Sequence, residues 1–154
     1  MVDQLPNSDT LAAMPREDAL RLAIEQLYFG YRAFTDTPDH ILDQRGLGRV
    51  HHRILYFVGR NPQISVNVLL ALLNVSKQAL NAPLRQLIEM HLIAMDTAEH
   101  DRRVRQLSLT PSGSKLEGQL TGSQMKQLQA VFDQVGAGAE AGWHEVMRRL
   151  AEQA

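Results

Sequence analysis

The chain has no cysteine, so disulfide bonds, thiolate metal sites and thiol redox sensing are excluded. It also has no apolar run of about eighteen residues, the length that a membrane-spanning helix needs. The first fifteen residues, MVDQLPNSDTLAAMP, have neither a basic start nor a long apolar core, so they do not predict a secretion signal. We therefore expect a soluble, cytoplasmic protein.

Net charge is small as well, at -1 over 154 residues, but it is unevenly distributed. Residues 1–44 carry eight acidic and three basic side chains, residues 45–115 carry four and ten, and residues 116–154 carry five and three. Basic charge confined to the middle indicates a central module that binds a polyanion between two acidic arms. Ordinary solvated surface charge is the alternative.

The N-terminal arm predicts a long helix over residues 16–35. Apolar residues repeat there at spacings of four and three, along one seam: Leu20, Ile24, Leu27, Tyr31 and Phe34. Such a seam is typical of a helix that packs along another helix, although a core face inside one monomer has the same pattern. Pro38 is expected to end the helix, because proline disfavours helical backbone at the residue before it.

The central module predicts a helix-turn-helix. A helix over about residues 47–59 leads into it and ends at a glycine and an Asn-Pro pair. Ser65 and Ser76 are good N-caps for two short helices, over residues 66–73 and from residue 77 to about residue 90. Each helix has an inward stripe of leucines. Two short capped helices joined by about three residues form a helix-turn-helix. We call its second helix the recognition helix.

A hairpin and two further helices follow. LIAMD (92–96) and VRQLSL (104–109) predict two strands with a polar turn, which makes a wing beside the helix-turn-helix. Thr110-Pro111 predicts the start of a helix that runs to about residue 135. The apolar stripe of that helix is thin through GQLTGSQMKQ (118–127), so we expect a helix that is not buried as a whole in the core. GAGAEAG (136–142) predicts a flexible break before a last helix.

The outer face of the recognition helix carries side chains that suit double-stranded DNA. Gln78, Asn81 and Arg85 form one line along the helix. Asn and Gln can pair with adenine, and Arg can bind guanine or phosphate with two bonds. Ser76 and Lys77 lie at the helix N-terminus, whose free N–H groups attract phosphate. An ordinary polar outer face is the alternative, and the wing and the central charge favour DNA.

Pro83 lies inside the recognition helix and removes one of its hydrogen bonds. A kink of more than ~20° is the expected result. The bend is either harmless or changes how Gln78 and Asn81 point relative to Arg85, and the sequence leaves both possibilities open.

The turn of the predicted wing contains three arginines within four residues, Arg102, Arg103 and Arg105. A wing tip can reach the minor groove next to the recognition helix, where a negative potential favours arginine. We expect Asp101 to pair with Arg103 and hold the turn, which leaves Arg102 for the groove. A solvated hairpin turn is the alternative.

The order of the predicted elements and three segments resemble the MarR family of bacterial transcriptional regulators. The segments are SVNVLLALLNVSKQALNAPLRQLIEMHLI, the D-x-R pattern at Asp101 to Arg103, and LSLTPSG. The resemblance covers roughly residues 16–152. The fold expected is mainly α with a small β-hairpin wing. Its parts are an N-terminal dimerisation helix and linker (16–46), a winged helix-turn-helix DNA-binding domain (47–110) and C-terminal dimerisation helices (111–154).

The resemblance also implies a function. Family members bind a pseudo-palindromic operator as homodimers, with recognition helices about 10 base pairs apart, usually as repressors. They often release DNA when a phenolic or aromatic carboxylate binds. Matched position by position, the groove residues are Ser76, Lys77, Gln78, Asn81 and Arg85, and the wing residues are Asp101, Arg102 and Arg103. Pro83 departs from the family's pattern, and the lack of cysteine excludes the peroxide-sensing branch.

The segment LGRVHHRILYF (47–57) belongs to a helix that commonly lines the ligand pocket in such proteins. His51, Arg53 and Tyr56 are therefore candidates for holding an anionic ligand, although Arg53 could instead contact DNA phosphate. His51 on the apolar face is otherwise read as a buried, hydrogen-bonded histidine. His51 and His52 point about 100° apart and are poor partners for one metal ion.

Two other classes of function are weighed against DNA binding. The basic charge of residues 45–115 argues against a winged helix that is used for protein–protein assembly without DNA. A small hydrolase or metal site based on the histidine pair disagrees with the sequence, which has no nucleophile elbow, glycine-rich phosphate loop or metal-ligand spacing. We expect no enzymatic activity and no cofactor.

Overall fold

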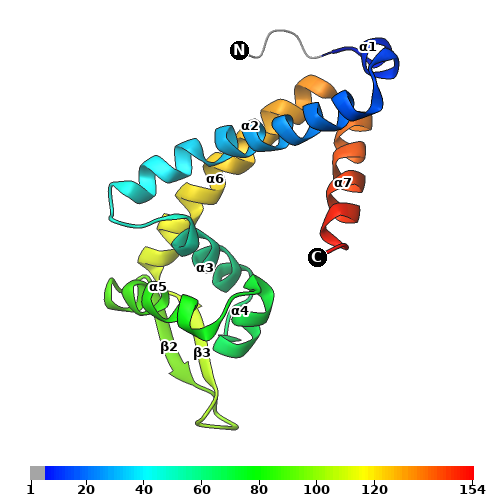
Figure 1. Cartoon of the computed structure of the whole chain (residues 1–154). Helices are drawn as coiled ribbons and strands as arrows, with labels where there is room; N and C mark the ends of the chain where they lie inside the picture. Colours follow the sequence, from blue (N-terminus) through cyan, green and yellow to red (C-terminus); the bar gives the residue numbers. More distant parts are fainter. Residues whose placement is uncertain (1–5) are drawn as a thin grey trace. The chain divides into compact units, whose positions relative to one another are not determined.

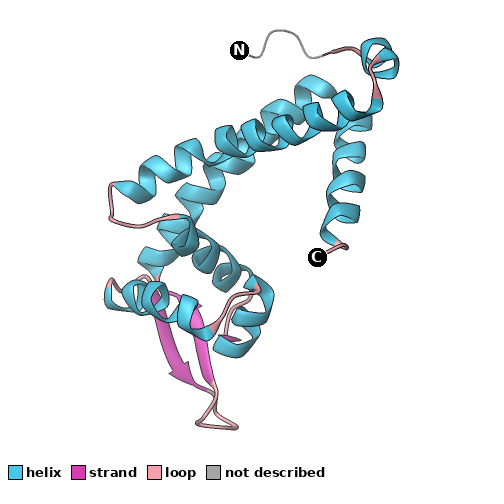
Figure 2. Cartoon of the chain, in the orientation of Figure 1, coloured by secondary structure: helices cyan, strands magenta, loops and turns pink. Residues whose placement is uncertain are grey.

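The computed structural model describes residues 6–154 as a mainly helical chain with one small sheet (Figures 1 and 2). The helices are α1 (Ser8–Ala13), α2 (Arg16–Asp43), α3 (Arg49–Arg60), α4 (Val66–Leu73), α5 (Lys77–Glu89), α6 (Pro111–Val135) and α7 (Ala137–Ala151). The strands are β1 (Ile64–Ser65), β2 (Ile93–Thr97) and β3 (Arg105–Leu109). The predicted fold class is confirmed. Along residues 6–154, no helix combines the length and the apolar character that crossing a membrane requires.

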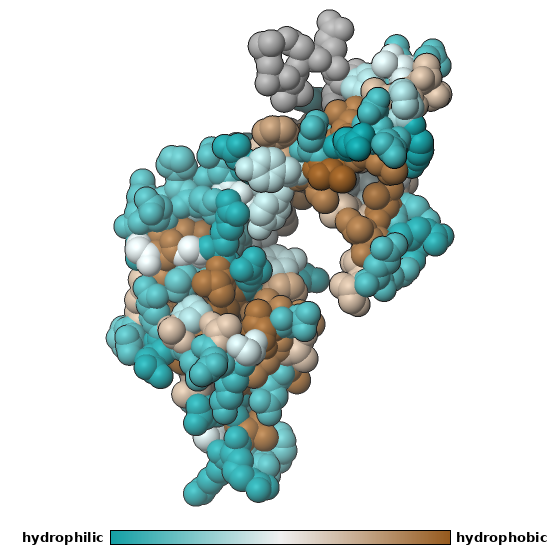
Figure 3. Space-filling model, viewed as in Figure 1, coloured by the Kyte–Doolittle hydropathy of each residue, from teal (hydrophilic) through white to brown (hydrophobic). Residues whose placement is uncertain are grey.

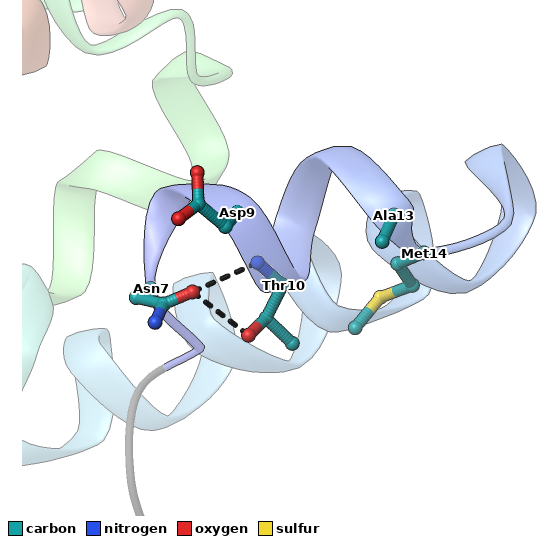
Figure 4. A pocket seen from close by; sticks show the side chains of 5 residues that line it. All are labelled: Asn7, Asp9, Thr10, Ala13 and Met14. Carbon is teal, nitrogen blue, oxygen red and sulfur yellow. Dashed lines mark hydrogen bonds between the residues drawn. The ribbon is translucent and has the colours of Figure 1, made fainter.

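The chain divides into two compact units after Asp36. The first contains α1 and most of α2. Asn7 caps α1, since its side-chain oxygen accepts hydrogen bonds of 2.8 Å from both the backbone N–H and the hydroxyl of Thr10 (Figure 4). An open surface pocket beside this cap is lined by Asn7, Asp9, Thr10, Ala13 and Met14. Its lining has one carboxylate and no basic group, so the pocket suggests no chemistry.

Helix α2 continues through Pro38 to Asp43, so the predicted end before Pro38 was wrong. Proline removes one helical hydrogen bond, which is a local cost. Contacts in the following turn outweigh it. Leu42 is fully buried, and Asp39 accepts hydrogen bonds from Nε and Nη2 of Arg49 at 3.1 and 2.9 Å. Tertiary packing of the last turn therefore carries the helix past its proline.

The core of the second unit (Thr37–Ala154) lies between α3, α5, β3 and the first half of α6. Its fully buried side chains include Ile54, Leu55, Leu69, Leu80, Leu87, Leu107, Leu116 and Leu120. Burying one such side chain contributes on the order of 2 kcal/mol. As predicted, α6 is not buried as a whole, but Leu116 and Leu120 in its polar half reach the core. Two leucines one turn apart make a stripe that is narrow but fully buried.

The sheet has the order β1–β3–β2 and is antiparallel throughout. The predicted hairpin is confirmed, with Ile93 opposite Leu109 and Thr97 opposite Arg105. β1 was not predicted. It has two residues, which is too short for any alternation, and it pairs Ile64 with Leu107. It anchors the start of α4 to the wing.

Helix α7 begins at Ala137, directly after Gly136, whose φ is +90°. The predicted flexible break over 136–142 was therefore wrong beyond its first residue. Alanines in this segment favour helix strongly enough to offset its two further glycines. The ring of Trp143 on α7 stacks edge-on against Phe132 on α6, with the ring centroids 5.8 Å apart.

Candidate nucleic-acid interface

The turn between α4 and α5 is set by three residues. Asn74 adopts a left-handed backbone with φ of 51°, and the Val75 N–H reaches back to the Leu70 carbonyl at 3.3 Å, which closes α4. The Ser76 hydroxyl then accepts a 3.1 Å hydrogen bond from the Ala79 N–H. Ser65 caps α4 in the same way, from Val68 at 3.2 Å. Both predicted N-caps are confirmed, and they fix where the recognition helix α5 begins.

Helix α5 separates a buried face from a polar one. Leu80, Leu84 and Leu87 are buried. The side chains on the opposite face are all exposed: Ser76, Lys77, Gln78, Asn81 and Arg85. The helix runs without interruption from Lys77 to Glu89 through Pro83. The predicted groove residues thus lie together on one exposed surface.

The wing tip is ordered by hydrogen bonds inside the turn. The Ala98 N–H binds the Val104 carbonyl at 2.9 Å. The Asp101 carboxylate accepts hydrogen bonds from the backbone N–H of Arg103 at 3.0 Å and from its Nε at 3.2 Å, as predicted. These bonds lower the pKa of Asp101 and keep it ionised. Arg102 is exposed and makes no hydrogen bond or ion pair within residues 6–154. The wing, at the bottom of Figure 3, ends in a hydrophilic tip.

The start of α6 holds the wing against the end of α5. The Thr110 hydroxyl donates to the His91 carbonyl at 2.6 Å and accepts from the Gly113 N–H at 3.0 Å. The Thr110 N–H donates to the Leu92 carbonyl at 3.1 Å. Gly113 packs so closely that an added Cβ would lie 1.9 Å from the Leu92 carbonyl oxygen. The predicted helix start at Thr110-Pro111 is confirmed, and its hydrogen bonds connect the start of α6 to the segment between α5 and β2.

Of the ligand candidates on α3, only His51 is buried, with 9% of its surface exposed. Its Nδ1 accepts a hydrogen bond from the Gly48 N–H at 2.9 Å, and its Nε2 lies 2.9 Å from Gln86 Oε1. Arg53 is exposed, and the half-buried ring of Tyr56 packs edge-on against Phe57 at 5.2 Å. Among the residues described, no group of three or more His, Cys, Asp or Glu side chains could hold a metal ion.

His52 lies at the contact between α3 and α6. Its Nε2 is 3.2 Å from the Thr121 hydroxyl. Burial lowers the pKa of His52, while the nearby carboxylates of Glu117 and Asp39 act in the opposite direction and Arg53 adds to the lowering. The fold therefore favours the neutral form of this ring.

Comparison with known proteins identifies the family. A family model described as the MarR family matches residues 45–104, which span α3, the helix-turn-helix and most of the wing. The HTH-type transcriptional regulator PetP of Rhodobacter capsulatus is 39% identical over 149 residues, covering 97% of this chain and 89% of PetP. The chain belongs to the MarR family. It is therefore a MarR-type DNA-binding transcriptional regulator and not an enzyme.

Solved structures show the same MarR fold. FabT of Streptococcus pneumoniae, in complex with DNA, is 17% identical and has a TM-score of 0.75 over 86% of this chain and 95% of FabT. NadR, in complex with 4-hydroxyphenylacetate, is 20% identical and has a TM-score of 0.68 over 81% of this chain and 89% of NadR.

Two polar contacts inside this MarR protein escaped the sequence analysis. Gln86 on α5 turns toward His51 rather than toward solvent, and His52 meets Thr121 on α6. Because Gln86 is polar and follows Arg85, the sequence predicts that it belongs to the polar outer face of α5. No pattern in the sequence indicates that it instead contacts a residue on another helix. Burial of a polar residue between two helices is decided by tertiary packing.

Proposed function

We propose that this protein is a sequence-specific repressor that binds a pseudo-palindromic operator in double-stranded DNA as a homodimer and responds to a small ligand. The observation that carries the proposal is the exposed line of Gln78, Asn81 and Arg85 on the capped helix α5. It lies in the same compact unit as a wing whose Arg102 is exposed and unpaired within the described residues. The DNA complex of FabT supports this use of the fold.

The side chains of this surface divide into two kinds of contact. Gln78 and Asn81 can each pair with an adenine edge, and Arg85 with guanine or phosphate. Ser76 and Lys77 at the start of α5 supply phosphate contacts, which set the position of the helix on the duplex. In the wing, Asp101 holds Arg103 and leaves Arg102 for the minor groove.

A second copy of the chain is proposed from the exposed apolar side chains of three helices. They are Leu20, Ile24, Leu27, Tyr28, Phe29 and Tyr31 on α2, Met125, Val131 and Val135 on α6, and Trp143, Val146 and Leu150 on α7. Hydrophobic side chains along α7 are visible in Figure 3. So many large apolar side chains in water mark an interaction surface. A twofold dimer would place two recognition helices about one turn of DNA, roughly 34 Å, apart.

The ligand that we propose is a small phenolic or aromatic carboxylate. Arg53 offers a guanidinium for the carboxylate, and Tyr56 on the same helix offers an aromatic edge. His51 would shape the site from behind, since both of its ring nitrogens are already bonded. The 4-hydroxyphenylacetate complex of NadR supports a ligand of this class.

The deciding experiment is selection of bound duplexes from a random pool, followed by affinity measurements on the selected and a scrambled duplex over a range of salt. We expect two half-sites about 10 base pairs apart and a steep loss of affinity with salt. A pool without enrichment, together with no salt-dependent binding, would favour the protein–protein assembly module instead.

Ligand response is tested with the same duplex. Adding 4-hydroxyphenylacetate should release DNA, whereas 4-hydroxyphenylacetamide, which lacks the negative charge, should not. Arg53→Ala should abolish the difference between the two compounds. Equal release by both compounds would remove Arg53 as the carboxylate partner. Placing the selected duplex across a reporter promoter then distinguishes repression from activation.

A further inference from the structure

A chain of side-chain hydrogen bonds joins the connection between α2 and α3 to the recognition helix. The Gly48 N–H donates to His51 Nδ1 at 2.9 Å, and His51 Nε2 meets Gln86 Oε1 at 2.9 Å. Gln86 Nε2 in turn donates to the Gly46 carbonyl at 3.3 Å. The chain thus begins and ends on the same short connection and passes through α5. Neither His51 nor Gln86 belongs to the exposed face of α5 that is proposed to read DNA.

The Gly46 carbonyl and the Gly48 N–H together determine the orientation of the Gln86 amide and the position of the hydrogen on the His51 ring. Gly46 offers a carbonyl, so Gln86 must turn its NH₂ group toward Gly46 and its oxygen toward His51. Gly48 offers an N–H, so His51 Nδ1 must accept and Nε2 must carry the hydrogen. The ring is therefore the neutral Nε2–H tautomer, donating to Gln86. His51 stands at the third position of α3 and takes the part that Glu or Gln plays in a capping box.

The link joins the end of α2 to the helix that carries the proposed DNA-reading side chains. Gly46, with φ of +70°, lies just past the end of α2, where the Leu47 N–H closes the helix on the Leu42 carbonyl at 2.9 Å. Gln86 follows Arg85 directly on α5. The hydrophobic effect that holds the leucines beneath α5 is non-directional, whereas hydrogen bonds depend on angle. The hydrogen bonds of the link therefore specify the rotation of α5 more closely than the leucine contacts do.

We propose that His51 and Gln86 are positioning residues that fix the rotation of α5 relative to the end of α2, and with it the register of Gln78, Asn81 and Arg85 in the major groove. The inference rests on the proposed sequence-specific binding and adds the device that aligns it. A change in the direction of α2 at Gly46 reaches the recognition helix through this link.

Two substitutions separate the link from the helix cap. His51→Gln keeps an acceptor for the Gly48 N–H, as in a regular capping box, but loses the bond to Gln86. Gln86→Met keeps the length of the side chain and the helix propensity. It removes the hydrogen bonds of Gln86 to His51 and Gly46 and leaves the bond from the Gly48 N–H to His51 intact. Gln119→Met, on the exposed surface of α6, is the matched control. The double variant His51→Gln/Gln86→Met tests whether the two residues act as one unit.

Affinities for the selected and the scrambled duplex are measured at one salt concentration for the full-length variants. Each single variant should lose about three- to tenfold affinity for the selected duplex. The scrambled duplex should bind unchanged, and the double variant should be no weaker than either single one. In ¹⁵N-resolved NMR of the wild type, the His51 Nε2–H should resist exchange with water, and Gln86→Met should abolish that protection.

The outcomes are distinct. If both duplexes weaken equally, or neither changes, the positioning role is overturned, and the proposed function stands as long as the wild type distinguishes the two duplexes. A wild type that binds both duplexes alike would remove the proposed function and this inference together. Should His51→Gln fail to fold, Gln86→Met and its NMR signal still decide the question.

Discussion

At the scale of single residues, neighbouring arginines on the wing tip have different surroundings. Arg103 donates to Asp101 from its backbone and its side chain, whereas Arg102 has no partner within residues 6–154. The pairing of Asp101 with Arg103 could be predicted, because the two residues share one tight turn. Which arginine stays unpaired followed from the same local geometry.

Arg102→Ala should weaken binding to every duplex to a similar degree. One lost phosphate or groove contact should flatten the slope of log affinity against log salt by about 0.9. Fluorescence anisotropy at several salt concentrations measures this. Arg149→Ala on α7, whose side chain is ion-paired with Glu145, is the control and should keep the wild-type slope. An unchanged slope in Arg102→Ala would rule out the wing contact.

Asn81→Ala should relax base preference rather than weaken all duplexes. An amide that pairs with one base edge contributes about 1–3 kcal/mol of discrimination at that position. Repeating the duplex selection with the variant measures this as lost preference at one position in each half-site. If all sequences weaken alike, Asn81 contacts the backbone and not a base.

His52 should make the stability of the fold depend on pH. Burial lowers its pKa from the ordinary value of 6.5, so the unfolded chain binds this proton more tightly than the folded chain. The stability that the neutral ring provides is present above pH 6.5 and is lost as pH falls below it. His52→Gln should therefore show a smaller drop in Tm between about pH 7.5 and about pH 5.5 than the wild type. An identical drop would contradict the assignment.

At the scale of elements, the ends of helices divide into those set locally and those set by packing. The caps at Ser65, Ser76 and Thr110 were predicted, because each depends on a side chain within three residues of the N–H that it accepts. The end of α2 was not, because the contacts of Leu42 and Asp39 that carry it past Pro38 lie on other elements. The buried stripe of α6 was missed for a similar reason.

Gly113→Ala tests the corner between wing, α5 and α6. The new methyl group would lie 1.9 Å from a backbone oxygen that cannot move alone, so the start of α6 must shift. We expect a loss of about 1–3 kcal/mol in the free energy of unfolding. Gly118→Ala, one and a half turns further along α6 and with nothing within 4 Å of its Cβ, should instead stabilise the helix by up to about 1 kcal/mol. Urea unfolding measures the change in the free energy of unfolding for both variants. Changes of the same sign in the two variants would contradict the prediction.

At the scale of the whole molecule, the chain has both exposed apolar helix faces and a well-packed winged module. Ile24 on α2 is 68% exposed in the single chain. Ile24→Asp should therefore leave an isolated chain nearly undisturbed and should disrupt a homodimer, because the charge would be buried at the interface. Analytical ultracentrifugation should show the wild type as a dimer and Ile24→Asp shifted toward single subunits, with weaker operator binding. Glu25→Gln is the adjacent control, and a wild type that sediments as one subunit would refute the dimer.

The sequence by itself determined the winged helix-turn-helix, its caps, its hairpin and the exposed line of Gln78, Asn81 and Arg85, because each depends on side-chain type and spacing within one or two turns of chain. Tertiary structure alone decided the passage of α2 through Pro38, the burial of Leu116 and Leu120, the third strand, and the contacts of His51 with Gln86 and of His52 with Thr121. These features join residues that are far apart in sequence, and their free energy arises from burial and from hydrogen bonds that exist only once the elements have packed.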